Sequence, residues 1–281
     1  MELWYTQEHS PNVRLSIKVD RHIYSEQSRF QRIDVMESYE FGTFLTLDSQ
    51  MMVAEKDECI YHDMMVHVPM ATHPAIQKVL VIGGGDGGAV RELTRYKSIT
   101  HIDVVEIDKR VVEVCRHYLP QTASKLDDAR VHLYYEDGLR FVRDKEQAYD
   151  LILVDSTDPF GPGEGLFTKE FYGNCHKALK EDGILINQHE SPYYERNKGS
   201  LQKTYERVSA FFPITKFYGA CIPTYSSGYW LFGFASKKYD PVRDLKKDQW
   251  EALELDTQYY NTAIHKGSFA LPNMIKKLFD K

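Results

Sequence analysis

The sequence predicts an α/β protein, in which a domain with a mostly parallel sheet follows a small N-terminal antiparallel β domain. From Val79 onward, short apolar runs alternate with stretches of helical periodicity, as expected for a parallel sheet that is covered by helices on both faces. A run of glycines follows the first apolar run directly, which is typical of a ligand-binding turn between a strand and a helix. Before Lys56 the pattern is different, because alternating polarity and many β-branched and aromatic residues favour antiparallel strands.

The elements can be assigned in chain order. The N-terminal domain, which we place at residues 1–57, contains strand patterns over residues 14–28 and 29–48. The catalytic domain, residues 58–281, begins its sheet with strands expected at 78–83, 101–108, 131–137, 149–155 and 183–189. Helices are expected between them at 88–96, 109–119 and 168–179, and later a helix at 200–212, a strand at 229–236 and a last helix at 271–279.

Composition excludes several classes of protein. The chain has 281 residues, a formal net charge of -6 and 42% hydrophobic residues, so we expect a globular enzyme that binds neither nucleic acid nor an anionic membrane. No apolar run approaches the roughly 18 residues of a membrane span, and the first ten residues lack the pattern of a signal peptide, which predicts a cytoplasmic protein. The four cysteines form no C-x-x-C pair, so neither a zinc site nor a disulfide framework is expected.

The glycine-rich loop after the first strand contains an acid, Asp86, within the letters GGGDGG. Glycines let the backbone approach a ligand closely, but such loops occur in dinucleotide enzymes and in nucleoside-binding transferases alike. A carboxylate in the loop would repel a pyrophosphate, so this version favours a ligand that is neutral or cationic there. The alternative is that Asp86 only caps the following helix.

Acids also end the second and third predicted strands. Glu106 follows the glycines by about twenty residues, a spacing at which an acid can accept hydrogen bonds from both hydroxyls of a ribose. Asp108 is more simply explained as the cap of the next helix. Asp137 followed by Gly138 could receive an adenine amino group or could form an ordinary Asp-Gly turn.

The fourth strand ends in Asp155, with Asp158 three residues later. Ligands of an open α/β sheet bind beyond the carboxyl ends of its strands, so the acids at these ends should converge on one crevice. So many carboxylates without a basic residue in the same motifs require cations. A divalent metal is one possibility, but acids distributed over separate loops suit an organic polycation at least as well.

Together these motifs resemble the spermidine synthases. The resemblance is carried by GGGDGG, VEID, YEDG, DSTDPFGP and the tripeptide YHD at residues 61–63, which occur in the right order. It extends from the N-terminal strands to TYSSGYWLFGFAS and so covers most of the chain. It implies a Rossmann-like domain of the methyltransferase type.

The resemblance also assigns roles to individual residues. It implies that Asp155 is the proton acceptor and that Asp86 faces the amino end of the aminopropyl chain, where it would repel the carboxylate of intact S-adenosylmethionine. It places further residues around the polyamine, namely Asp158, Tyr61, His62 and Tyr225, with Gln50 and Gln188 as weaker candidates. It assigns to the nucleoside Gln31, Glu106, Asp137, Gly138 and Pro162.

The activity implied by the resemblance is transfer of an aminopropyl group from decarboxylated S-adenosylmethionine to putrescine, in a homodimer or homotetramer. The nucleoside is then a co-substrate, so we expect neither a cofactor nor a metal. The alternatives are an amine N-methyltransferase that uses intact S-adenosylmethionine, a relative that accepts spermidine or agmatine, a dinucleotide-binding protein and a polyamine-binding protein without turnover. Asp86 argues against the methyltransferase, and the paired acids at 155 and 158 argue against a protein without catalysis.

Overall fold

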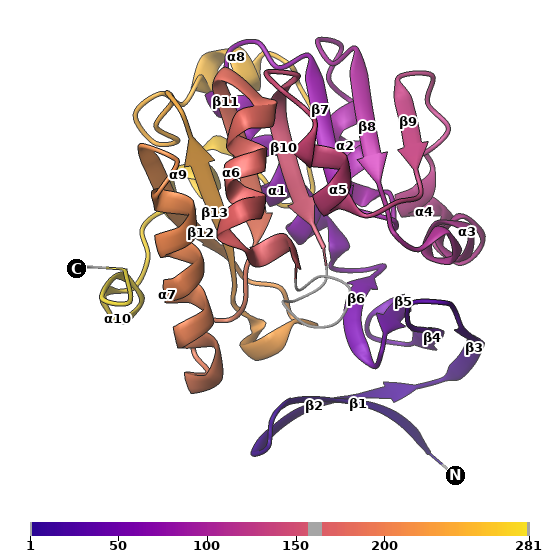
Figure 1. Ribbon diagram of the computed structural model, residues 1–281. Coiled ribbons are helices and arrows are strands. Elements are labelled where there is room, and N and C mark those ends of the chain that lie inside the picture. The colour runs from indigo at the N-terminus through magenta and orange to yellow at the C-terminus, as the bar shows by residue number, and fades with distance from the viewer. Residues whose placement is uncertain (1, 157–164, 280–281) are drawn as a thin grey trace.

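The N-terminal region is built of antiparallel strands, as predicted. The computed structural model describes residues 2–156 and 165–279 (Figure 1). Its first two strands form a hairpin of their own, and the next four form a sheet in chain order. The strands are β1 (Leu3–Ser10), β2 (Val13–Val19), β3 (Arg21–Gln27), β4 (Arg32–Ser38), β5 (Gly42–Leu47) and β6 (Gln50–Ala54). The boundary that we placed after residue 57 falls between β6 and the first helix, which begins at Glu58.

A seven-stranded sheet forms the rest of the core, in the order β12-β13-β11-β10-β7-β8-β9. Its strands are β7 (Lys78–Gly83), β8 (His101–Val105), β9 (Val131–Tyr134), β10 (Tyr149–Asp155), β11 (Leu179–Gln188), β12 (Ile214–Ala220) and β13 (Trp230–Ser236). Within this sheet β13 runs in the direction opposite to the other strands, which are parallel to one another. The five strands predicted for the parallel part are thus present, and the α/β fold class is confirmed.

Helices cover both faces of this sheet, because its strands are apolar on both faces. In β7, Val79 and Val81 contribute to one hydrophobic core, whereas Leu80 and Ile82 contribute to the other. The first core is covered by α1 (Glu58–Thr72), α2 (Gly88–Thr94), α3 (Lys109–Tyr118) and α4 (Pro120–Ala123). The second core is covered by α5 (Gly138–Arg143), α6 (Lys169–Ala178) and α7 (Glu195–Ser209).

The long helix α1 was not among the predicted elements. Twelve of its 15 residues are buried, so it has no polar face and shows no amphipathic period. Three shorter elements at the C-terminal end of the chain also follow no clear pattern, namely β12, α8 (Lys247–Glu251) and α9 (Thr262–Ser268). The predicted last helix is present as the short α10 (Asn273–Lys276). In the two described stretches of the chain, no helix combines the length and the hydrophobicity that a membrane span requires.

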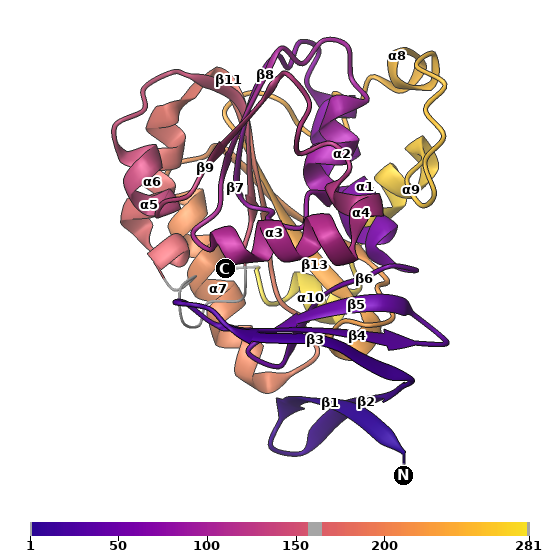
Figure 2. The ribbon, with the colours of Figure 1, turned by 90° about the vertical axis from the view of Figure 1, so that its right-hand side faces the viewer.

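The N-terminal sheet lies across the carboxyl ends of the parallel strands, with the β1-β2 hairpin farther out (Figures 1 and 2). The strand order reverses between β7 and β10, where a crevice opens at the sheet edge. Residue pairing places Asp155, the last residue of β10, directly beside Gly83 at the end of β7. The fold therefore places the glycine-rich loop beside Asp155, the expected proton acceptor.

Candidate active site

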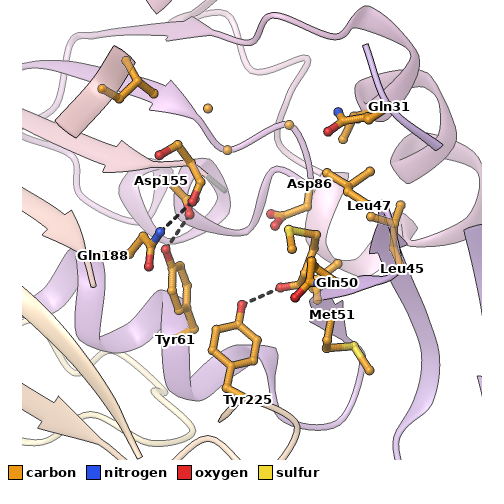
Figure 3. Close-up of a pocket in the computed structure, with 18 of the residues that line it drawn as sticks. Gln31, Leu45, Leu47, Gln50, Met51, Tyr61, Asp86, Asp155, Gln188 and Tyr225 are labelled. Atoms are coloured by element: carbon orange, nitrogen blue, oxygen red, sulfur yellow. Dashed lines mark hydrogen bonds between the residues drawn. The ribbon is translucent and has the colours of Figure 1, made fainter. Parts of the chain in front are cut away.

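A large cavity lies at this crevice, between the N-terminal sheet and the ends of the parallel strands. Leu45, Leu47 and Met51 of the N-terminal sheet face Asp86 and Asp155 across it (Figure 3). Of the residues predicted from the sequence, those that line the cavity are Gln31, Gln50, Tyr61, Asp86, Glu106, Asp137, Gly138, Asp155, Gln188 and Tyr225. Two predicted residues, Asp158 and Pro162, lie outside the described residues.

The glycine loop makes close contact with the end of β10. The backbone N–H of Gly84 donates a hydrogen bond to the carbonyl of Asp155 at 2.8 Å. A Cβ atom on Gly83 would lie 2.0 Å from that same carbonyl oxygen, and the φ of Gly83 is +84°. Only glycine fits such a position without a shift of the backbone. The loop thereby fixes the position of the Asp155 backbone, from which the side chain extends.

Asp155 has one oxygen that accepts a hydrogen bond and one that has no partner among the described residues. The Tyr61 hydroxyl donates to Oδ1 at 2.7 Å, whereas Oδ2 is buried without a hydrogen-bond partner in the described part of the chain. Burial and the nearby charge of Asp86 raise the pKa of Asp155 to about 6. A buried oxygen without a partner is costly, so Oδ2 is poised to receive a donor from a ligand.

Asp86 contacts the start of the following helix and also lines the cavity. Its Oδ1 accepts a hydrogen bond from the backbone N–H of Gly88 at 2.6 Å, at the start of α2, and the side chain also lines the cavity. The same oxygen lies 3.4 Å from Nε2 of His62. Burial tends to raise the pKa of Asp86, but the adjacent His62 outweighs it and the pKa is lowered. Asp86 is therefore ionised when Asp155 begins to take up a proton.

His62 occupies a different place from the one predicted. It was expected to line the cleft, but the described residues around the cavity do not include it. Its side chain is 2% exposed and lies behind Asp86, with Nδ1 at 2.5 Å from Glu58 Oε2. The carboxylate of Asp86 separates it from the cavity, so a direct contact with a polyamine remains a prediction that this geometry does not favour.

Glu106 and Asp108 follow the second strand of the parallel sheet, and Glu106 lines the cavity. Glu106 Oε1 accepts from the backbone N–H of Asp108 at 2.9 Å, and burial raises the pKa of Glu106 to about 7. Asp108 caps α3 by accepting from Arg110 N at 3.0 Å, as the sequence suggested. Asp108 Oδ2 also accepts from the side-chain amide of Gln31 at 3.2 Å, which links β8 to the N-terminal sheet.

Asp137 and Gly138 begin a helix and not an isolated turn. Asp137 Oδ1 accepts from Leu139 N at 2.9 Å and so caps α5. A Cβ atom on Gly138 would lie 2.4 Å from Cγ2 of Ile82, so the glycine lets α5 approach β7. Both residues line the cavity.

Several residues of the cavity wall were not predicted. Ser226 and Trp230 line the cavity, and the Ser226 Oγ and Trp230 Nε1 atoms are buried without a partner among the described residues. Gln188 donates to the Ser156 carbonyl at 3.0 Å, while its Oε1 is also without a described partner. Both residues lie in the segment TYSSGYWLFGFAS, but their contact with the cavity depends on how β13 packs beside β11. With Asp155 Oδ2, these atoms form a polar lining that a ligand could satisfy.

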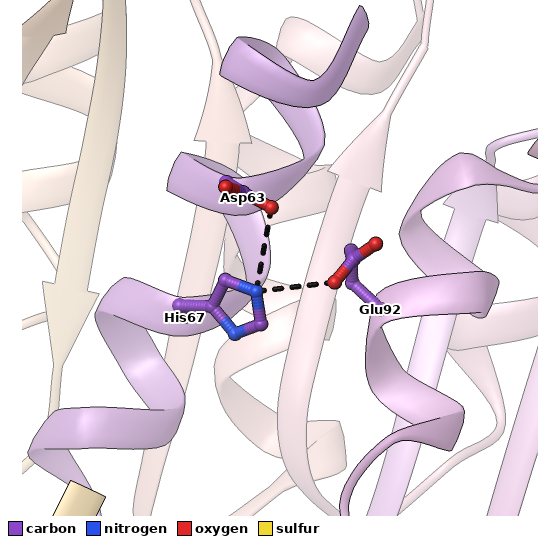
Figure 4. A group of neighbouring side chains, drawn as sticks. All are labelled: Asp63, His67 and Glu92. Atoms are coloured by element: carbon purple, nitrogen blue, oxygen red, sulfur yellow. Dashed lines mark hydrogen bonds and ion pairs between the residues drawn. The ribbon is translucent and has the colours of Figure 1, made fainter. Parts of the chain in front are cut away.

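A second cluster of buried acids and histidine lies outside this cavity. Asp63, His67 and Glu92 have side-chain atoms close enough to hold a metal ion (Figure 4). Glu92 already accepts from Arg91 at 2.8 Å and from Arg95 at 2.6 Å. Asp63 Oδ2 accepts from two backbone N–H groups, those of Tyr259 and Tyr260, and His67 Nδ1 pairs with the Tyr96 hydroxyl at 2.6 Å. Glu92 thus pairs with the guanidinium groups of both Arg91 and Arg95, which favours a buried hydrogen-bonded network over a metal site.

Fold and cavity together define a Rossmann-like α/β protein with an acidic ligand cavity at the switch point of its sheet. Comparison with known families gives a more particular result. Residues 58–247 match the spermine/spermidine synthase domain, and residues 3–55 match the spermidine synthase tetramerisation domain. The chain belongs to the spermine/spermidine synthase family, which confirms the resemblance seen in the sequence.

Individual relatives resemble the chain over its whole length. A polyamine aminopropyltransferase of Alkaliphilus oremlandii is 69% identical over 281 residues, which is 100% of this chain and 99% of that protein. A polyamine aminopropyltransferase of Lachnoclostridium phytofermentans is 60% identical, covering 99% of this chain and 98% of that one. The crystal structure of spermidine synthase from Thermotoga maritima has a TM-score of 0.94 at 43% identity, and covers 98% of this chain and 94% of its own. A spermidine synthase in complex with the transition state analogue AdoDATO has a TM-score of 0.95 at 44% identity, with the same coverage.

Proposed function

We propose that this aminopropyltransferase is a spermidine synthase, which transfers the aminopropyl group of decarboxylated S-adenosylmethionine to putrescine, with Asp155 as proton acceptor. The observation that carries the proposal is the pair of carboxylates in the cavity. Asp155 accepts a hydrogen bond from Tyr61, its Oδ2 has no partner in residues 2–156 and 165–279, and it lies beside Asp86, whose pKa is lowered. Such a site attracts ammonium groups and also provides a base. The names of the close relatives support the same activity.

The lining of the cavity supports one orientation of the donor. In this orientation Glu106 accepts the ribose hydroxyls and Asp137 and Gly138 contact the adenine, and all three residues line the cavity. The aminopropyl chain then extends toward Asp86, whose charge pairs with its ammonium group. Intact S-adenosylmethionine carries a carboxylate at that position, which Asp86 would repel.

The reaction is a direct displacement. The lone pair of a free amine of putrescine attacks the aminopropyl carbon next to the sulfonium, the carbon–sulfur bond breaks, and the sulfur keeps the electron pair. Neutral methylthioadenosine leaves, and the amine gives up one proton to Asp155. No covalent enzyme intermediate is needed, so alignment of the two substrates contributes much of the rate enhancement.

The raised pKa of Asp155 lowers the free-energy cost of moving a proton from the amine to this carboxylate. A primary amine has a pKa of about 10.4 and an ordinary Asp about 3.9, so moving the proton would cost about 9 kcal/mol. With Asp155 at about 6, the remaining gap of about 4.4 units corresponds to about 6 kcal/mol. Burial of Asp155 next to Asp86 thus supports its role as base.

The assembly is the second part of the proposal. The match of residues 3–55 to a tetramerisation domain supports a homo-oligomer, and we propose a homotetramer in preference to the homodimer that the resemblance also allowed. In the described chain the β1-β2 hairpin projects from the body (Figure 2) and exposes half of the surface of Leu3 and Trp4. Light scattering at several concentrations tests this: a mass of four chains is expected, and a stable dimer would contradict it.

Product analysis by mass spectrometry tests the activity. The protein is incubated with putrescine and, in separate tubes, with decarboxylated or intact S-adenosylmethionine. We expect spermidine and methylthioadenosine in the first tube alone. Methylated putrescine in the second tube would instead establish an N-methyltransferase. Faster formation of spermine from spermidine, or of aminopropylagmatine from agmatine, would show that the preferred acceptor is not putrescine.

A further inference from the structure

Asp108 is a buried acid next to the cavity that the reaction does not use. It is 2% exposed, and among the described residues it is not one of those that line the cavity. It lies between the end of β8 and the start of α3. Its backbone and its two carboxylate oxygens each make a different hydrogen bond, and the partners come from both domains of the chain.

Two of these contacts lie within the catalytic domain. The backbone N–H of Asp108 donates to Glu106 Oε1 at 2.9 Å, and Oδ1 accepts from Arg110 N at 3.0 Å, which caps α3. A serine at this position would keep both contacts, because any residue has the backbone N–H and a serine hydroxyl caps helices about as well as a carboxylate. The second carboxylate oxygen therefore needs another explanation.

That second oxygen, Oδ2, holds the turn of the N-terminal sheet that carries Gln31, directly before β4. It accepts from Gln31 Nε2 at 3.2 Å and from the Ser28 hydroxyl at 2.6 Å. Ser28 Oγ in turn accepts from the backbone N–H of Gln31 at 3.0 Å. Asp108 thus fixes Gln31 twice, directly through the side-chain amide and indirectly through the backbone by way of Ser28.

The contact also determines which atom of the Gln31 side chain is left for a ligand. An ionised carboxylate only accepts hydrogen bonds, so the part of the amide that faces Asp108 is the NH2 group. Gln31 itself is 6% exposed and lines the cavity, as Figure 3 shows. Its carbonyl oxygen, Oε1, is then the atom offered to a ligand, which must supply a donor such as a ribose hydroxyl.

We propose that Asp108 is a positioning residue for the nucleoside, which orients Gln31 so that its carbonyl oxygen accepts a hydrogen bond from a nucleoside hydroxyl. The inference rests on the proposed function, since that function places the nucleoside of the donor against Gln31 and Glu106. Through its backbone N–H, Asp108 also holds Glu106. One residue outside the cavity therefore sets the separation of two acceptors that come from different domains, and it couples the docking of the N-terminal sheet to donor binding.

A neighbouring contact between the same two domains supplies a matched control. Arg110 of α3 donates to both carboxylate oxygens of Glu26 in β3, at 3.0 and 2.8 Å. Among the described residues, neither of these two side chains lines the cavity. Glu26→Gln weakens this link and leaves Asp108 and Gln31 in place, so the dissociation constant of methylthioadenosine should stay within about twofold of the parent value.

Calorimetry with methylthioadenosine, which carries both ribose hydroxyls, tests the proposal at pH 8. Asp108→Ser keeps the helix cap but is too short to reach Gln31, and should raise the dissociation constant by about threefold to tenfold, the effect of one lost hydrogen bond. Gln31→Met should cause a loss of similar size. In the Gln31→Met background, Asp108→Ser should change the constant by less than about twofold, because the group that it orients is already absent. The KM of putrescine at saturating donor should be unchanged in Asp108→Ser.

An exchange of the two groups separates orientation from general support of the fold. Gln31→Glu alone places a second carboxylate against Asp108, and should weaken binding of methylthioadenosine more than Gln31→Met does. With Asp108→Asn added, donor and acceptor change places across the contact, and a carboxylate oxygen at position 31 is again available to the ligand. The double variant should therefore bind about threefold or more tightly than Gln31→Glu alone.

Each outcome decides a different point. Additive effects of Asp108→Ser and Gln31→Met would overturn the proposal, as would an unchanged dissociation constant in Asp108→Ser or an equal loss in Glu26→Gln. If Asp108→Ser does not fold, Ser28→Ala removes the indirect half of the same contact and takes its place in the cycle. A parent protein that binds methylthioadenosine but forms no spermidine would instead refute the proposed function, and the binding cycle would still decide the role of Asp108.

Discussion

The hydrogen bond from Tyr61 to Asp155 should set the pH below which the enzyme loses activity. Tyr61→Phe removes the hydroxyl that donates to Oδ1 at 2.7 Å and keeps the ring, which packs against Tyr225 and Phe232. A hydrogen bond to a charged group contributes about 1.5–3 kcal/mol, or about 1–2 pKa units. The bond stabilises the carboxylate form, so its loss should raise the pKa of Asp155 from about 6 to about 7 or above.

The size of the effect follows from the ionised fraction of the base. At pH 5.5, a shift from a pKa of about 6 to about 7 lowers the ionised fraction from about 24% to about 3%, an eightfold loss. At pH 8 the same shift costs only about 10%. Activity depends on the deprotonated form, so the acidic limb of the profile should move to higher pH.

The assay is kcat/KM for putrescine between pH 5.5 and 8.5, expressed as the ratio of Tyr61→Phe to the parent protein. The ratio cancels the ionisation of putrescine, which is the same for both proteins. It should fall about sevenfold from pH 8 to pH 5.5. A ratio that does not change with pH would refute the reasoning, because the hydroxyl would then act on binding or packing and not on the proton acceptor.

Three further predictions concern other residues of the site. Asp155→Asn should lower kcat by about a hundredfold to ten-thousandfold in single-turnover measurements while methylthioadenosine still binds, and a parent-like kcat would remove Asp155 as the base. Glu106 has a folded pKa of about 7 against 4.5 for the ordinary group, so its contribution to stability falls as pH rises through this window. Glu106→Gln should therefore stabilise the unliganded protein by about 3 kcal/mol at pH 8 and by almost nothing at pH 4. Urea titrations that give equal gains in the free energy of unfolding at both pH values would contradict the buried acid. Gly83→Ala should lower the free energy of unfolding by more than about 4 kcal/mol or prevent folding. Gly199→Ala in α7, where an added Cβ would have no atom of the described chain within 4 Å, should instead stabilise the protein by about 0.5–1 kcal/mol. Similar melting temperatures for the two variants would be inconsistent with the loop geometry.

The parallel sheet could be predicted because its strands are apolar on both faces and are separated by clear helical patterns. The positions of Asp86, Glu106, Asp137 and Asp155 at or just after the carboxyl ends of these strands then predicted that they share one crevice, and all four line the cavity. This inference needs only chain order and the rule that parallel strands end at one edge.

The opposite wall could not be predicted in the same way. Leu45, Leu47 and Met51 reach the cavity because the N-terminal sheet folds back over the crevice, and no local pattern encodes that docking. The burial of His62 could not be predicted either. The residue belongs to the tripeptide YHD, which fits a site motif, yet the helix that carries it is buried on all sides. A motif identifies the residue types at a site, whereas depth below the surface depends on tertiary packing.

The glycine loop has a consequence for how this sequence can change over evolutionary time. Gly83, Gly85 and Gly88 each lie against a different neighbour, namely the Asp155 backbone, the Glu106 carboxylate and the His62 ring. A side chain gained at any of them would disturb a different part of the cavity: the start of the Asp155 side chain, the Glu106 carboxylate or the imidazole beside Asp86. Drift in this segment should therefore be accepted only with compensating changes on β10, β8 or α1, and a deep mutational scan should find these three glycines intolerant for three unrelated reasons.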